Sequence, residues 1–156
     1  MSTRIAVVIA FLSLIGCTPP PPGRVAATLP CDGTGRCEVK IINPTCSTTP
    51  CSADVDFDTV KFTRGKHDIK VHWRLPAGFG FCPNTGDGVF LKKPEGDNQF
   101  KDPGVDGQDG PGVCKRPQFV MTARNTKVDT KYQYKIVFHD AAGNTEYIVD
   151  PLMFNE

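Results

Sequence analysis

The sequence has almost no net charge, no helical periodicity and none of the common catalytic motifs. Its 156 residues carry 18 lysines and arginines against 17 aspartates and glutamates, so no surplus of positive charge would draw the chain to nucleic acid. No stretch of ten or more residues places apolar side chains at the 3.6-residue period of an amphipathic helix. We therefore expect little helix and no nucleic-acid partner.

Signatures of catalysis are absent as well. The chain has no Gly-x-Ser-x-Gly elbow, no His-Glu-x-x-His motif, no phosphate-binding lysine loop and no Gly-x-Gly-x-x-Gly at the start of a helix. By strand parity, His72 and His139 lie on polar faces, and they could share a surface site only if their strands were neighbours. We expect a protein that is not an enzyme and needs no cofactor.

The N-terminus contains one apolar run, from Ile5 to Ile15, which is too short to cross a bilayer because a spanning helix needs about 20 residues. The four prolines Pro19–Pro22 follow soon after and prevent a helix from continuing. A basic residue, Arg4, a short apolar core and a small residue, Gly16, are typical of a secretory signal.

The end of this run, Leu14-Ile15-Gly16-Cys17, resembles the lipobox of bacterial lipoproteins. The resemblance implies that residues 1–16 are a lipoprotein signal peptide, that cleavage occurs before Cys17, and that Cys17 carries the lipid. Two or more acyl chains hold a protein stably at a membrane, whereas one binds only marginally. Thr18 stands where inner-membrane lipoproteins usually carry an aspartate, which implies the outer membrane. An ordinary signal peptide with a coincidental cysteine is the alternative.

Residues 17–30 are predicted to form the lipidated cysteine and a proline-rich stalk. The segment 18–30 has five prolines in thirteen residues. Such composition favours an extended polyproline conformation of about 3.1 Å per residue, which gives a spacer of up to roughly 40 Å. A proline-recognition motif is the alternative interpretation.

Six cysteines remain after the lipobox and are expected to form disulfides, because an exported chain folds under oxidising conditions. They are Cys31, Cys37, Cys46, Cys51, Cys82 and Cys114. Six cysteines can pair in fifteen ways. The first two and the middle two each bracket a turn sequence, which favours joining neighbours and leaves the last two for each other.

The cysteine spacing argues against a metal site. No Cys-x-x-Cys pair exists, and the intervals match no zinc module. The stretch after Cys114 offers Met121 but no histidine, so it lacks the ligand cluster of a blue-copper protein. We assign no metal to these cysteines.

Seven or eight short segments alternate apolar and polar residues between Gly, Pro, Asn or Asp, a pattern typical of half-buried strands. Their apolar members are Val39 and Ile41, Val55 and Phe57, Val60 and Phe62, Ile69, Val71 and Trp73, Phe119 and Met121, Tyr132, Tyr134, Ile136 and Phe138, and Tyr147 and Val149; the apolar run Val89-Phe90-Leu91 is one more candidate strand. Residues 31–156 are therefore predicted to be all-β, an antiparallel immunoglobulin-like β-sandwich stapled by disulfides. Asp140–Asn144 is predicted to be a hairpin turn.

The segment Asp97–Gly112 is predicted to be a long loop, and long loops in compact domains are often functional. With its flanks it provides a candidate contact surface, which consists of Phe79, Phe81, Asp97, Phe100, Asp102, Asp106 and Asp109. There are two alternatives. The phenylalanines could cap the core, and the aspartates could bind calcium, although they lack the usual calcium-loop spacing.

These features together favour a non-enzymatic, lipid-anchored envelope protein whose β-domain binds a protein or glycan partner. A periplasmic inhibitor of a cell-wall hydrolase is one alternative. Calcium binding through the Asp97–Gly112 segment is another.

Overall fold

Strands are the only regular secondary structure in the computed structural model, which describes residues 28–33, 37–47, 49–57, 59–83, 85–93, 98–106, 112–127 and 129–155. The lipobox with Cys17, the predicted stalk up to residue 27, Asp97 and Asp109 lie outside the described residues. None of the described residues belongs to a helix long and apolar enough to span a bilayer. The prediction of an all-β domain is confirmed.

The described residues form twelve strands. In chain order they are β1 (Thr28–Cys31), β2 (Cys37–Thr45), β3 (Cys51–Val55), β4 (Thr59–Phe62), β5 (Ile69–Arg74), β6 (Phe79–Gly80), β7 (Gly88–Lys93), β8 (Phe100–Asp106), β9 (Gln118–Ala123), β10 (Thr130–Asp140), β11 (Glu146–Val149) and β12 (Leu152–Asn155). They follow one path, β1-β4-β12-β10-β11-β3-β2-β5-β9-β8, with β6 and β7 attached to β10.

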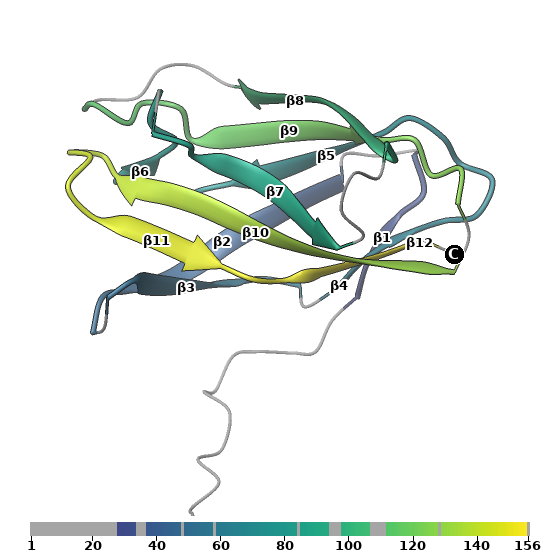
Figure 1. Ribbon diagram of the computed structural model, residues 1–156, viewed down its shortest axis with the longest axis horizontal. Helices are drawn as coiled ribbons and strands as arrows, with labels where there is room; N and C mark the ends of the chain where they lie inside the picture. Colours follow the sequence, from purple (N-terminus) through teal and green to yellow (C-terminus); the bar gives the residue numbers. More distant parts are fainter. Residues whose placement is uncertain are drawn as a thin grey trace, which may run out of the picture.

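Strand β2 connects two parts of this path. Its first residues, Cys37–Lys40, pair with β5, whereas residues from Ile41 onward pair with β3. We call the part from β1 to β3, with β6 and β7, sheet A, and the part containing β5, β9 and β8 sheet B. In Figure 1, β5 and β2 pass behind the layer that contains β7, β10 and β11.

Strand β10 is the centre of sheet A, and Figure 1 shows it running between β7 and β11. One edge of β10 pairs with β12 and then with β11, and the other edge pairs with β7 and then with β6. Pro151 separates β11 from β12, since a proline has no backbone N–H to continue a ladder. Because β6 and β7 reach β10 from the segment that contains Cys82, β10 positions that segment.

Residues from both sheets form one core, and the alternation predicted which of their side chains are buried. Ile69, Val71 and Trp73 of β5 are buried, and so are Tyr132, Tyr134, Ile136 and Phe138 of β10. Trp73 Nε1 donates a hydrogen bond of 3.3 Å to the Tyr134 hydroxyl across the core. Burial raises the pKa of Tyr134 far above its ordinary value, so this hydroxyl stays protonated.

The predicted antiparallel arrangement is wrong at four pairings. β4 is parallel to both β1 and β12, β3 is parallel to β11, and β2 is parallel to β5. Hydrophobic alternation shows which side of a strand is buried, and it is the same for parallel and antiparallel neighbours. The path of the chain between strands decides their direction, and the pattern does not contain it.

The structure also has more strands than the seven or eight predicted. β6 has only two residues, β1 lies at the end of the segment predicted to be stalk, and β12 (Leu-Met-Phe-Asn) has three apolar residues in a row and does not alternate. β1 begins at Thr28, three residues before the boundary expected at Cys31. β8 was predicted to be loop because its sequence contains Asp, Pro and Gly; it pairs with β9 through a register shift after Lys101, and Asp102 there has φ of 52°.

Three disulfides join Cys31 to Cys37, Cys46 to Cys51, and Cys82 to Cys114, which confirms the predicted pairing. The first joins β1 to β2 and the second closes the turn between β2 and β3. The third joins the chain after β6 to the chain before β9, across a sequence separation of 32. It is thus the only one of the three that crosslinks segments distant in sequence.

Candidate functional site

The three phenylalanines of the predicted contact surface pack into the core. Phe81 is 1% exposed. Phe79 packs on Tyr147, and Phe100 packs on Tyr132, each at 5.2 Å between ring centroids. Phe79 contacts the C-terminal end of β10 and Phe100 its N-terminal end, so the structure does not bring them together.

The two described aspartates of that surface are also separate. Asp102 and Asp106 are both on β8, where four residues of an extended strand span roughly 13 Å. This distance is too long for both carboxylates to bind one ion directly.

The two histidines on polar faces do not form a common site. His72 is on β5, whose partners are β2 and β9, whereas His139 is on β10 in sheet A. The two strands are not neighbours, so the condition for a two-histidine site is not met.

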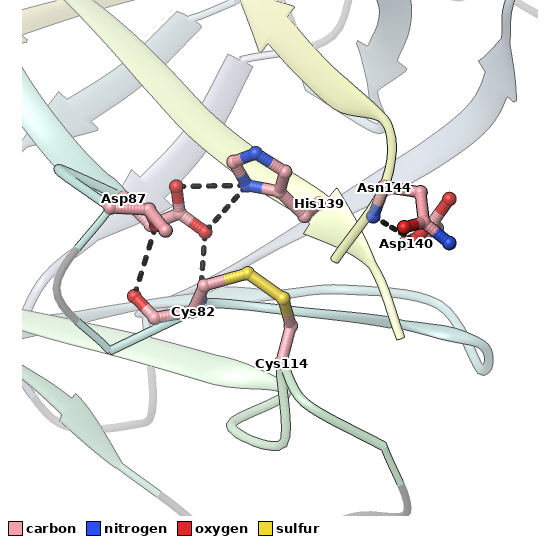
Figure 2. A network of polar contacts seen from close by, with 7 residues as sticks. Cys82, Asp87, Cys114, His139, Asp140 and Asn144 are labelled. Carbon is pink, nitrogen blue, oxygen red and sulfur yellow. Dashed lines mark hydrogen bonds and ion pairs between the residues drawn. A yellow bond between two sulfur atoms is a disulfide. The ribbon is translucent and has the colours of Figure 1, made fainter. Parts of the chain in front are cut away.

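A different cluster forms around His139. The ligand atoms of Cys82, Asp87 and His139 all lie within 4.8 Å of one another. His139 Nδ1 is 3.0 Å from each of the two Asp87 carboxylate oxygens, and the Cys82 backbone N–H donates a hydrogen bond of 2.7 Å to Asp87 Oδ2. Figure 2 shows these contacts and the disulfide that continues the cluster to Cys114.

Burial makes this cluster electrostatically unusual. The Asp87 side chain is 0% exposed and that of His139 is 12% exposed. A buried carboxylate requires hydrogen bonds or an opposite charge to offset its lost hydration. Oδ2 has both Cys82 and His139 as partners, whereas Oδ1, although close to the imidazole, accepts no hydrogen bond. The second ring nitrogen of His139 points away from the carboxylate (Figure 2).

The turn Asp140–Asn144 follows His139 directly at the end of β10. The Asn144 backbone N–H donates a hydrogen bond of 3.0 Å to Asp140 Oδ1, and this bond chiefly lowers the pKa of Asp140 below its ordinary value. Gly143 has φ of 77°, a conformation that glycine adopts readily. The predicted turn at Asp140–Asn144 is confirmed.

The Cys114 segment packs closely against this turn and against β6. The backbone N–H groups of Val113 and Cys114 donate to the Ala141 carbonyl at 2.8 and 3.3 Å. A side chain at Gly80 would overlap the Cys114 carbonyl, and one at Gly112 would overlap the Ala141 carbonyl. Glycine at both positions therefore permits the backbone contact that places Cys114 beside Cys82.

Two hollows lie on either side of the segment Cys114–Pro117. The first, of about 210 Å³, includes Phe81, Cys82, Val105, Val113, Lys115 and Arg116 in its lining. The second, of about 400 Å³, includes Arg74, Leu75, Pro76, Phe79, Cys114 and Lys115. We call the end of the domain that carries the hollows and the Cys82–Asp87–His139 cluster the disulfide end.

The hollows of the disulfide end combine apolar walls with positive charge. Val113 and Val105 are 65% and 43% exposed, unusual values for large apolar side chains. Arg74, Lys115 and Arg116 contribute cations, and among the described residues no aspartate or glutamate lines either hollow. Arg74 also lies 3.8 Å from the Glu38 carboxylate. The arrangement suits a ligand with apolar and acidic groups.

Sequence reasoning missed Asp87 and the hollows. Asp87 and His139 are 52 residues apart, and only the pairing of β6 and β7 with β10 brings them together. The pattern around Asp87, a carboxylate just before Gly88 in a turn-rich segment, is common in surface turns and gives no specific signal.

No model of a known protein family matches this chain, and no curated protein matches it in sequence. The residues of the disulfide end and the N-terminal sequence are therefore what indicates the function of this chain.

Proposed function

We propose that this chain is a lipid-anchored protein of the bacterial outer membrane whose β-domain binds a protein partner without catalysing a reaction. The resemblance of Leu14–Cys17 to a lipobox supports the anchor. The disulfide end supports the binding role, and its hollows on both sides of Cys114–Pro117 are the observation that carries the proposal.

The chemistry of the hollows defines the partner. Exposed Val105 and Val113 gain free energy when an apolar side chain covers them, by about 25 cal/mol for each Å² removed from water. Lys115 lines both hollows and is exposed, so it offers a cation to a carboxylate of the partner at this surface. The partner is therefore a protein segment with acidic side chains next to apolar ones.

A protein partner is favoured over a glycan. Sugar rings commonly stack on exposed aromatic side chains, but the aromatic residues at the hollows, Phe79 and Phe81, belong to the core. The exposed Phe90 is on β7, with the Lys135 ammonium 5.4 Å from its ring centroid, so a cation already occupies that face.

We further propose that the platform for this site is an immunoglobulin-like sandwich. The contact of Trp73 in sheet B with Tyr134 in sheet A, at 5.7 Å between ring centroids, supports two facing layers with a Trp at their centre. The four parallel pairings are a departure from that architecture.

Site-specific photocrosslinking tests the binding site. A photoreactive amino acid replaces Val113 in the lipidated chain, and Lys66, exposed in the turn before β5 at the other end, is the matched control position. We expect an adduct with one defined protein from position 113, and its loss when Lys115→Glu is added. Equal labelling from positions 113 and 66, or an adduct insensitive to Lys115→Glu, would overturn the proposal.

A periplasmic inhibitor of a cell-wall hydrolase is a second candidate, favoured by the same lysine. Glycoside hydrolases use a pair of carboxylates in a cleft, and Lys115 is a cation that lines both hollows. Activity assays with lysozymes distinguish an inhibitor from a protein that only binds a partner. An inhibitor lowers lysozyme activity and loses potency on Lys115→Ala, whereas a protein that only binds its partner has no effect on the enzyme.

A further inference from the structure

The disulfide end also brings together three side chains that can bind a metal ion, and a disulfide holds a fourth, Cys114, next to one of them. The ligand atoms of Cys82, Asp87 and His139 lie within 4.8 Å of one another, and Cys114 Sγ is bonded to Cys82 Sγ. Two sulfurs, one imidazole nitrogen and one carboxylate oxygen match the four-coordinate ligand sets that proteins use for zinc. While the sulfurs are joined they carry no negative charge, and the thiolate is the form that binds metal strongly.

We propose that Cys82, Cys114, Asp87 and His139 form a zinc site when the Cys82–Cys114 disulfide is reduced. A dithiol reductant supplies two electrons and two protons: its own sulfurs become a disulfide, the Cys82–Cys114 bond breaks, and both cysteines become thiols. Binding of Zn²⁺ then releases two protons to solvent and forms two metal–thiolate bonds. This inference does not depend on partner binding.

The state of Asp87 is an independent observation that points to a cation. Its side chain is fully buried, and Oδ1 accepts no hydrogen bond. The His139 imidazole, with Nδ1 3.0 Å from Oδ1, is the one group described beside this atom that becomes cationic on protonation, and a buried carboxylate oxygen without a hydrogen bond favours a cation as neighbour. Two thiolates would add negative charge beside this carboxylate, and a divalent cation offsets that repulsion.

The hollows lie beside the two cysteines. Cys82 contributes to the wall of the first hollow and Cys114 to the wall of the second, although both residues are largely buried. The link between the chain after β6 and the chain before β9 would thus be covalent under oxidising conditions and metal-mediated under reducing ones.

Cobalt titration tests the site, because Co²⁺ replaces Zn²⁺ in tetrahedral sites and absorbs visible light. The full-length chain in detergent is reduced with a dithiol, separated from it under inert gas, and titrated with Co²⁺ alone. We expect one Co²⁺ per chain, with tetrahedral visible bands and a thiolate-to-cobalt absorption. The oxidised chain should show neither.

Three variants assign the ligands. His139→Ala should weaken Co²⁺ affinity at least about tenfold, since even loss of an outer-shell partner costs about 10- to 100-fold. The double variant Cys82→Ser with Cys114→Ser should lose the thiolate absorption. His72→Ala, which leaves the cluster intact, is the matched control and should match the wild type.

Circular dichroism of the oxidised chains shows whether His139→Ala and His72→Ala fold before reduction. Absence of the thiolate absorption in the reduced wild type would overturn the proposal. So would equal Co²⁺ binding by the wild type and His139→Ala, because it would assign the metal to other cysteines, including those of a chain that unfolds on reduction.

Discussion

Asp87 is the residue on which the local structure of the disulfide end depends most. Its carboxylate accepts from the Cys82 backbone and contacts His139, and so joins the turn after β6 to the end of β10. Removing one partner of a buried polar group leaves the other without a hydrogen bond, which costs more than the bond itself contributes. The stability of this end should therefore respond to a single substitution.

We expect Asp87→Ala to lower the free energy of unfolding by about 1–3 kcal/mol, because the Cys82 N–H and the imidazole both lose their acceptor. Urea denaturation measures it. Glu146, an exposed acid directly across from His139 in the β10–β11 ladder, is the matched control. Glu146→Ala should change the value by less than about 0.5 kcal/mol. Equal losses in the two variants would contradict the role given to Asp87.

Asp140 should make stability depend on pH in the acid range. Backbone N–H donors, Asn144 first, lower its folded pKa below the ordinary value of 3.8. A lowered folded pKa stabilises the fold above pH 3.8, and this contribution is lost as the pH falls through the folded pKa. Asp140→Asn removes the titration, so its deficit in thermal stability against wild type should be present at about pH 6 and shrink below 3.8. A deficit independent of pH would contradict this assignment.

The disulfides differ in the length of chain that they close between strands. Cys82–Cys114 closes a separation of 32 residues, whereas Cys31–Cys37 closes 6. In the chain-entropy description a crosslink stabilises by restricting the unfolded chain, and the effect grows with the logarithm of the loop.

Removing the long-range disulfide should therefore cost more than removing a short one. We expect the pair Cys82→Ala with Cys114→Ala to lose about 3–4 kcal/mol, and Cys31→Ala with Cys37→Ala about 2 kcal/mol. The midpoints of thermal unfolding of the two double variants give the comparison. A larger loss from the Cys31–Cys37 pair would show that the short bridge acts through native contacts instead.

The strands with strong alternation could be predicted from the sequence, and the less regular ones could not. Trp73 and Tyr134 are buried as their positions in alternating segments required. The sequence pattern does not predict β8 as a strand, because its Asp, Pro and Gly residues are poor strand formers. Pairing with β9 overrides that preference. The disulfide pairing could be predicted because two of the disulfides each close a local turn. The two remaining cysteines then had only each other as partners.

The candidate site needed information that local patterns do not contain. Asp87 meets His139 only because β6 and β7 both pair with the same edge of β10, which aligns residues 52 positions apart. The hollows likewise depend on how closely the Cys114 segment approaches Gly80 and Ala141. Such contacts follow from the tertiary path and not from composition.

For the whole molecule, the proposal combines a membrane anchor at one end of the sequence with a binding site on the domain. Net charge is close to zero, with 18 basic and 17 acidic residues, so attachment by general electrostatic attraction is weak. The lipid on Cys17 would then keep the protein at the membrane, and the hollows would be the surface that binds its partner.

Cys17→Ala should release the protein from the membrane fraction while leaving the domain folded, because a chain without acyl groups has no anchor. Fractionation of cells followed by immunoblotting measures the distribution. Cys82→Ala, which changes a domain cysteine and keeps the lipobox sequence, is the control and should remain with the membranes. Retention of Cys17→Ala there would contradict the anchor.

Binding of an acidic segment at the disulfide end is tested by the affinity of the crosslinked partner for charge-reversed chains. The partner is purified and titrated against wild type, Lys115→Glu and Lys66→Glu. We expect binding to weaken at least about tenfold, or about 1.4 kcal/mol, for Lys115→Glu only, because Lys66 lies at the other end of the domain. Equal affinities for the three chains would contradict binding of an acidic segment there.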